Sequence, residues 1–182
     1  DPSYRVFFDD GEIIDISSDI EKNYEIFERL EENGAEKLRK YLDVCKKQYD
    51  IAMDGFVYRT YNSIFDFFSP SMVANGLRLK AFSNYHKGVK KYFKNPKAQK
   101  LLEWIKVFLG GDQRNVPGMY CMMSYLDHHH GIYYPKGGMN GLAQKIYEIA
   151  KKNGVQFKFN EAVKKINVKE KQATDVITEK SE

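Results

Sequence analysis

Residues 131–139 read Gly-Ile-Tyr-Tyr-Pro-Lys-Gly-Gly-Met and separate two regions of different pattern. The Tyr-Tyr-Pro part favours an extended backbone, and Gly137-Gly138 is typical of a turn. An amphipathic helix is expected directly afterwards, at 142–152, because apolar residues recur there at helical spacing. We therefore predict two parts, a domain at 1–136 and a segment at 137–182.

Outward from this stretch, the pattern predicts both strands and helices. An Asp-Asp-Gly turn at 9–11 lies between two strand-like runs and predicts a β-hairpin. Ser18, followed three residues later by Glu21, predicts a capping box at the start of the first helix. Helices are expected at 19–31, 35–53, 82–93, 96–108 and 116–128, and strands at 155–159, 162–168 and 173–178. The fold class expected is α+β, with a mixed or antiparallel sheet packed by several helices.

The composition excludes several classes of protein. The chain has 182 residues, of which 42% are hydrophobic and 14% aromatic, so it is not a disordered tail. It contains no apolar run of the roughly 20 residues that a membrane-spanning helix needs. Two cysteines, Cys45 and Cys121, are too few for a disulfide framework, which favours a reducing, cytoplasmic location. Asp1 is not an initiating methionine, and a strand-like run precedes Glu182, so we expect a piece of a longer protein.

Charge is distributed unevenly. Residues 1–35 carry a net charge of −8 and residues 78–106 carry +8, within a total of +4. These segments either face each other, face different partners, or are solvated helical faces. The helix expected at 82–93 combines rings with lysines, which suits an anionic membrane surface, although a packed helix with a solvated lysine face fits equally. The candidate membrane residues are Phe82, Tyr85, Lys87, Lys90, Lys91 and Lys94.

No catalytic or metal motif stands out. The chain has neither a Gly-x-Gly-x-x-Gly fingerprint nor a phosphate-binding loop, and no nucleic-acid-reading motif accompanies its basic segment. His128, His129 and His130 are consecutive, so their side chains diverge and do not suit one metal ion. Asp66 and Arg59 lie in an aromatic stretch and are the only candidates for a catalytic role, with exposed salt bridges as the alternative.

Methionines and aromatic residues supply soft apolar surface that suits either a core or a cavity for an apolar ligand. The candidate substrate-binding residues are Phe65, Phe68, Met119, Tyr120, Met123, Tyr133 and Tyr134.

Several spaced motifs resemble one family, the phytoene desaturase-like flavoproteins, which are carotenoid dehydrogenases of the amine oxidase superfamily. Asp-Pro-Ser-Tyr-Arg at 1–5, with the Asp-Gly turn after it, is similar to the family's opening hairpin. The most specific match is 131–139, which resembles Gly-Val-Trp-Phe-Pro-x-Gly-Gly-Met, with Tyr133-Tyr134 in place of Trp-Phe. Asn160 to Ile166 resembles the pattern Leu-Asn-x-x-Val-x-x-Ile.

The resemblance implies a substrate-binding domain of an FAD-dependent oxidoreductase that introduces C=C bonds into a long polyene in carotenoid biosynthesis. It also implies that Gly137, Gly138 and Val163 lie toward FAD, and that the partner is the FAD-binding domain of the same chain. FAD is expected in the full-length parent and not in this fragment, which is expected to be inactive alone. A parent of this kind would be cytoplasmic or peripheral on the cytoplasmic membrane face. The alternative is a non-catalytic peripheral membrane or lipid-binding module.

Overall fold

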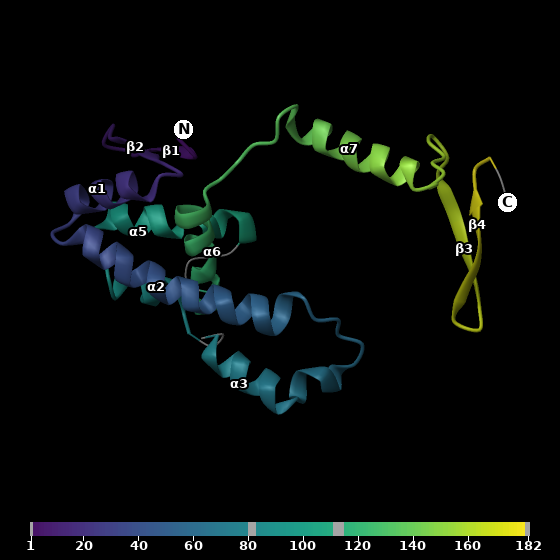
Figure 1. Ribbon diagram of the computed structural model, residues 1–182, viewed down its shortest axis with the longest axis horizontal. Helices are drawn as coiled ribbons and strands as arrows, with labels where there is room; N and C mark the ends of the chain where they lie inside the picture. Colours follow the sequence, from purple (N-terminus) through teal and green to yellow (C-terminus); the bar gives the residue numbers. More distant parts are fainter. Residues whose placement is uncertain (1, 80–82, 111–114, 181–182) are drawn as a thin grey trace. The chain divides into compact units, whose positions relative to one another are not determined.

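The computed structural model describes residues 2–79, 83–110 and 115–180. Its internal contacts divide the chain into unit 1, Asp1–Tyr133, and unit 2, Tyr134–Glu182 (Figure 1). Helices dominate the described residues, which contain two separate two-stranded antiparallel sheets. The fold is thus α+β in the broad sense. The single larger sheet that we expected is not formed by the described residues, because each hairpin pairs only with itself.

Unit 1 begins with a hairpin and continues with helices. The strands are β1 (Tyr4–Phe7) and β2 (Ile13–Ile16). The α-helices are α1 (Ile20–Leu30), α2 (Gly34–Ala52), α3 (Pro70–Arg78), α4 (Tyr85–Lys90), α5 (Pro96–Glu103) and α6 (Met122–Tyr125). Shorter 3-10 or π turns are η1 (Met53–Val57), η2 (Ile64–Phe68), η3 (Trp104–Leu109), η4 (Gly118–Cys121) and η5 (Leu126–His130).

The opening hairpin forms where the sequence predicts it. β1 and β2 pair antiparallel, with Tyr4 opposite Ile16. Alternate residues of β2 point into unit 1, so Ile14 and Ile16 are buried while Ile13 is exposed. The helix after the hairpin is capped by Asp19, whose carboxylate accepts a hydrogen bond from the backbone N–H of Glu21. The predicted cap at Ser18 is therefore one residue too early.

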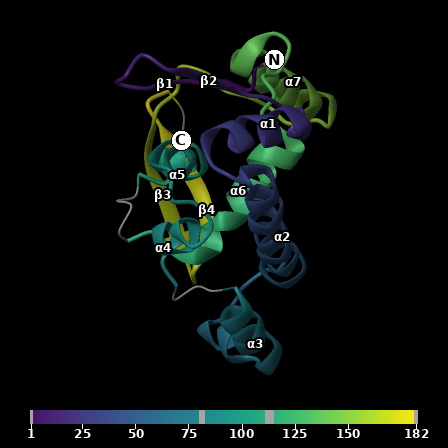
Figure 2. The same ribbon diagram turned by 90° about the vertical axis from the view of Figure 1, so that its left-hand side faces the viewer.

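The core of unit 1 is made by helices that are distant in sequence. α2 lies beside both α1 and α6 (Figure 2). The rings of Phe27 and Phe93 meet edge to face at a centroid distance of 5.3 Å, and neither side chain is exposed. Cys45 and Cys121 are both buried in this core, and neither forms a disulfide. The apolar stripes of α1, α2 and α5 contribute to this core together with residues of β2 and α4.

Glycine is required at the connection between α1 and α2. Asn33 is left-handed, with φ of 55°, and Gly34 follows it as the first residue of α2. A Cβ atom on Gly34 would lie 1.9 Å from the carbonyl oxygen of Phe27. The close approach of the two helices at this corner therefore depends on the missing side chain.

Two predicted helices differ from the expectation, one in its length and one in its type of turn. The helix predicted at 82–93 spans only Tyr85–Lys90, and Phe82 lies outside the described residues. The helix predicted at 116–128 is a continuous helical stretch from Gly118 to His130, which changes from a 3-10 turn (η4) through α6 to a π turn (η5). Residues 116–118 instead hydrogen-bond with the start of α4, since Tyr85 N donates to Val116 O and Gly118 N donates to Ser83 O.

Unit 2 contains α7 (Gly138–Lys152) and an antiparallel hairpin of β3 (Val163–Lys169) and β4 (Gln172–Thr178). The strand predicted at 155–159 is not a strand, because Phe157 and Phe159 turn onto Tyr147 of α7. No residue of α7 is buried. None of the described helices in either unit is long and apolar enough to span a membrane.

Candidate functional site

The predicted substrate-binding residues fall into three groups. Phe65 and Phe68 lie on η2 with 78% and 69% of their surface exposed. Tyr133 and Tyr134 are also exposed, at the end of unit 1 and the start of unit 2. The remaining three, Met119, Tyr120 and Met123, are half-buried on η4 and α6. Of these, Tyr120 and Met123 pack against the core.

The structure brings the two catalytic candidates to one cavity. A cavity of about 370 Å³ is lined by Arg59, Thr60, Tyr61, Phe65, Asp66, Ser69 and Met72. The carboxylate of Asp66 accepts hydrogen bonds from the backbone N–H groups of Asn62 at 2.9 Å and Ser63 at 3.0 Å. These bonds give Asp66 a definite structural role, since they cap the first turn of η2. They also place a carboxylate beside an exposed aromatic ring, Phe65.

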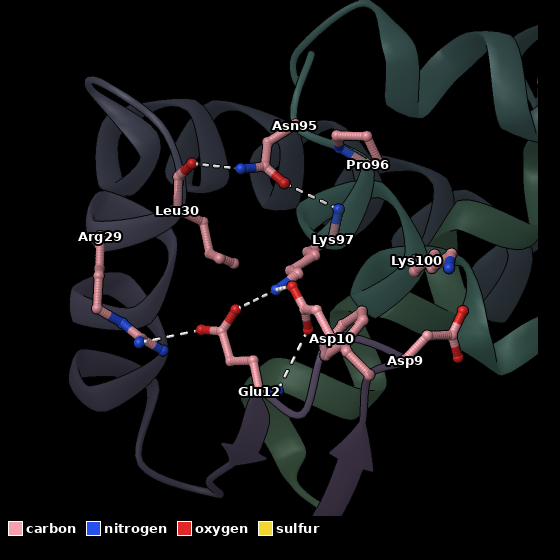
Figure 3. A pocket seen from close by; sticks show the side chains of 10 residues that line it. Asp9, Asp10, Glu12, Arg29, Leu30, Asn95, Pro96, Lys97 and Lys100 are labelled. Carbon is pink, nitrogen blue, oxygen red and sulfur yellow. Dashed lines mark hydrogen bonds and ion pairs between the residues drawn. The ribbon is translucent and has the colours of Figure 1, made fainter.

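A second cavity, of about 550 Å³, was not predicted (Figure 3). It lies between the hairpin turn, α1 and the start of α5. Lys97 reaches across it and pairs with both Asp10 and Glu12, and Arg29 pairs with Glu12 from the other side at 3.1 Å. The Lys97 ammonium lowers the pKa of the Asp10 carboxyl. The lining is charged and largely ion-paired, which does not suit a long apolar chain.

The acidic and basic segments of the sequence face each other in unit 1. Beside the ion pairs of Lys97, Glu31 accepts hydrogen bonds from the backbone N–H groups of Lys94 at 2.8 Å and Asn95 at 2.9 Å. The carboxylate of Glu31 also pairs with Lys37. Of the three interpretations left open by the charge pattern, these contacts support direct pairing for part of each segment.

The segment predicted to meet a membrane is partly buried. Tyr85 is 1% exposed, and its hydroxyl donates to the carbonyl of Leu102 at 2.6 Å. Burial raises the pKa of Tyr85. This ring is therefore not free to enter a headgroup layer while the fold is kept. The lysines of the same segment, Lys87, Lys90, Lys91 and Lys94, are all exposed.

A buried polar cluster precedes the glycine-rich stretch. Asp127, on the π turn η5, accepts hydrogen bonds from Tyr4 at 2.8 Å and Trp104 at 3.4 Å through one carboxylate oxygen. Its neighbour His128 is fully buried, with Nδ1 3.4 Å from the side-chain nitrogen of Asn23. Burial lowers the pKa of His128. The sequence offered no signal for this cluster, because Tyr4 and Asp127 are far apart along the chain.

The three histidines point in different directions. His128 faces the core beside Phe27, whereas His129 stacks on Tyr125 at 4.8 Å and His130 lies edge-on to the same ring. Within residues 2–79, 83–110 and 115–180, no group of three or more His, Cys, Asp or Glu is placed to hold a metal ion.

The residues expected near FAD all lie in unit 2. Gly137 and Gly138 have φ of 89° and 72°, so both adopt the left-handed conformation that favours glycine. They form the turn that begins α7, and the backbone N–H of Gly138 donates to the carbonyl of Pro135 at 2.8 Å. Val163 starts β3 opposite Thr178 and is 58% exposed. The two glycines lie at the start of α7, and Val163 lies beyond the other end of that helix (Figure 1).

Comparison with known proteins places the whole chain in one family. The family described as "Flavin containing amine oxidoreductase" matches residues 1–182. The carotenoid 3,4-desaturase of Haloarcula japonica is 33% identical over 168 residues, which cover 92% of this chain and 34% of that protein. The 4,4'-diapophytoene desaturases (4,4'-diaponeurosporene-forming) of Staphylococcus haemolyticus and Staphylococcus aureus are 29% and 28% identical over 163 residues, 90% of this chain and 32% of each relative.

The chain therefore spans about a third of the length of the curated relatives it matches. The resemblance inferred from the hairpin and from residues 131–139 is confirmed by these matches. On this match over its full length, the chain belongs to the flavin-containing amine oxidoreductase family.

Proposed function

We propose that this chain is the substrate-binding part, with an adjoining flavin-side segment, of an FAD-dependent desaturase that introduces C=C bonds into a long polyene. The observation that supports it is the alignment of about 90% of the chain with carotenoid and diapophytoene desaturases. In this proposal residues 1–136 bind the substrate, and residues 137–182 return toward the FAD-binding domain.

The different burial of the two units supports this division. Unit 1 has a core of its own, with residues such as Phe27, Leu38 and Phe93 fully buried. Unit 2 has an amphipathic helix whose apolar residues Leu142 and Ile149 are 45% and 61% exposed. An amphipathic helix is stable when its apolar face is covered. We infer that the flavin domain of the parent protein covers α7.

The proposed chemistry divides between cofactor and protein. FAD, when bound, accepts hydride from an allylic C–C unit while a proton is lost. The protein orients the polyene by apolar contact, since such a chain has no polar group to recognise. Phe65, Phe68, Met119, Tyr120, Met123, Tyr133 and Tyr134 are the residues proposed for that contact. Asp66 and Arg59 stay candidates for moving the proton, and Gly137, Gly138 and Val163 for meeting FAD.

Polyene binding is the first test. Trp104 is the only tryptophan of the chain, and it lies half-buried in unit 1. A conjugated C30 or C40 polyene, added in detergent micelles, should quench the fluorescence of Trp104 in a saturable way, because the polyene absorbs at the emission wavelength. Micelles without polyene are the control. Quenching that rises linearly with polyene and never saturates would contradict a binding site in unit 1.

Activity is tested in a chimera. The matched region of the Haloarcula japonica desaturase is replaced by this chain, and FAD retention is measured before activity. A chimera that holds FAD should lengthen the conjugated system of a polyene, seen as a red shift in absorption. A chimera that holds FAD and binds polyene but produces no red shift would favour the non-catalytic lipid-binding module instead.

A further inference from the structure

Two buried polar atoms lie close together at the end of unit 1 without a hydrogen bond. Nε2 of His128 is 3.9 Å from Oδ2 of Asp127, which is beyond hydrogen-bond distance. Within the described residues, neither this nitrogen nor the second carboxylate oxygen, Oδ1 of Asp127, has a hydrogen-bond partner. The two side chains are 0% and 3% exposed, so bulk water does not reach them. Because buried polar groups are normally hydrogen-bonded, this pair calls for a further partner.

The neighbouring Asn23 fixes which nitrogen of His128 carries the proton. The side-chain oxygen of Asn23 accepts from the backbone N–H of Ser17 at 3.0 Å, and its nitrogen donates to the carbonyl of Ser17 at 2.9 Å. These bonds assign the orientation of the amide, so the group 3.4 Å from Nδ1 of His128 is the NH2 donor. Burial lowers the pKa of His128, so the ring is neutral and has one proton. Since Nδ1 is the acceptor, that proton lies on Nε2.

The two atoms without a partner are chemically complementary. Nε2–H of His128 is a donor, and Oδ1 of the Asp127 carboxylate is an acceptor. The other carboxylate oxygen, Oδ2, already accepts from the Tyr4 hydroxyl at 2.8 Å and from Nε1 of Trp104 at 3.4 Å. A water molecule satisfies both atoms, because its oxygen accepts a hydrogen bond while one of its hydrogens is donated.

We propose that His128 and Asp127 bind one internal water molecule, which accepts from Nε2 and donates to Oδ1. The water joins the Asn23 side of the network to the Tyr4 side, so that α1, η5 and β1 share one set of hydrogen bonds. The rival arrangement is a direct bond between the two side chains, since a shift of about 1 Å would bring Nε2 and Oδ2 within hydrogen-bond distance.

The network lies where the chain leaves the helices of unit 1. The π turn η5 ends at Gly131, whose backbone N–H donates to the carbonyl of Leu126 at 3.2 Å. A Cβ atom on Gly131 would lie 2.9 Å from Cβ of Ser18, the residue after Ser17. The end of η5 is therefore held against this segment by packing at Gly131 and by hydrogen bonds through Asn23. All of these contacts lie within unit 1, so the proposal does not depend on the proposed function.

NMR of the 182-residue chain tests the site directly. The variant His86→Gln/His129→Gln/His130→Gln leaves His128 as the only histidine, so its ring signals can be assigned and then found in wild type. The ¹⁵N spectrum should show a protonated Nε2 and an unprotonated Nδ1. In a rotating-frame spectrum, the Nε2 proton should give a cross-peak to water with the sign of a through-space contact, which is opposite to that of chemical exchange.

Asp127→Asn removes the acceptor for the water. The amide oxygen keeps the bond from Tyr4, which leaves an NH2 donor in the place of Oδ1. The water then loses one of its two hydrogen bonds, so the cross-peak should be lost. Asp175→Asn is the matched control, because it makes the same chemical change on β4 of unit 2, and it should leave the cross-peak unchanged. Circular dichroism checks that each variant keeps its helices, and the wild-type spectrum decides the proposal even if Asp127→Asn does not fold.

Three results would overturn the proposal. A proton on Nδ1 of His128 would reverse the polarity on which the site depends. A proton on Nε2 without a cross-peak to water would show that His128 bonds directly to Asp127 or has no partner at all. A cross-peak that a folded Asp127→Asn variant leaves unchanged would show that other groups hold the water.

Discussion

Glu31→Gln tests the junction that holds α5 against α1. One carboxylate oxygen of Glu31 accepts from the backbone N–H groups of Lys94 and Asn95, and the other pairs with Lys37. The side chain is only 12% exposed, so water replaces these bonds poorly. A hydrogen bond to a charged group contributes about 1.5–3 kcal/mol. Glutamine keeps one weaker acceptor, so we expect a loss of about 2–3 kcal/mol in the free energy of unfolding.

The measurement is urea unfolding followed by the fluorescence of Trp104, which reports on unit 1 alone. Glu32→Gln is the matched control, because it makes the same chemical change at an exposed neighbour. Its effect should stay within about 0.5 kcal/mol, as for most surface substitutions. If the two variants lose equal stability, the hydrogen bonds of Glu31 contribute nothing net and the reasoning is refuted.

The difference in the free energy of unfolding between wild type and Glu31→Gln should depend on pH. Burial opposes the ionisation of Glu31, but the N–H groups of Asn95 and Lys94 and the Lys37 ammonium outweigh it, so the pKa of Glu31 lies below its ordinary value of 4.5. A lowered pKa gives stability that is present above the unfolded value and is lost as the pH falls through the folded value. The difference between wild type and Glu31→Gln should therefore persist at pH 5 and shrink below about pH 4.

Three further predictions concern packing, a buried base and the cofactor. Gly34→Ala should cost about 3 kcal/mol or more, because its Cβ would collide with the Phe27 carbonyl, whereas Gly76→Ala, with open space around it in α3, should stabilise by about 0.5–1 kcal/mol. Urea unfolding of both variants separates them, and equal effects would contradict the contact. The lowered pKa of His128 means that the unfolded chain takes up a proton that the fold does not, so stability should fall as the pH drops below about 6.5, by up to about 1.4 kcal/mol per pH unit. His128→Gln should lack that part of the slope, and an unchanged slope would assign it to other groups. The purified chain should be colourless, since it has no pyrophosphate-binding fingerprint, and a flavin absorption band in the purified protein would oppose the proposed division of labour.

The elements that the sequence predicted well are those whose pattern is local. The hairpin follows from alternation around an Asp-Asp-Gly turn, and α2 follows from an apolar stripe bounded by Asn33-Gly34. Both signals act within a few residues, so no knowledge of the rest of the chain is needed.

Elements that depend on distant partners were predicted less well. Tyr85 was predicted to face a membrane, but it is packed in the core, where its hydroxyl hydrogen-bonds with the carbonyl of Leu102 and the hydroxyl of Ser124. The helix predicted at 116–128 begins two residues later, at Gly118, because Val116 accepts a hydrogen bond from the backbone N–H of Tyr85 at the start of α4. The hydrogen bond from Tyr4 to Asp127 could not be predicted either, because the two residues are distant in the sequence. At the candidate site, the sequence placed Arg59 and Asp66 in one aromatic stretch, while the cavity that both line with Phe65 depends on the turn of η2.

The two buried cysteines allow the opening of unit 1 to be measured separately from that of unit 2. Cys45 and Cys121 are 0% and 7% exposed, both belong to unit 1, and unit 2 has no cysteine. An alkylating reagent reaches a thiol at such a site only when the surrounding helices separate. The rate of labelling therefore measures how often unit 1 opens. It does not change when α7 or the β3–β4 hairpin of unit 2 frays. A ligand that binds only closed unit 1 should slow the labelling of both thiols by the same factor.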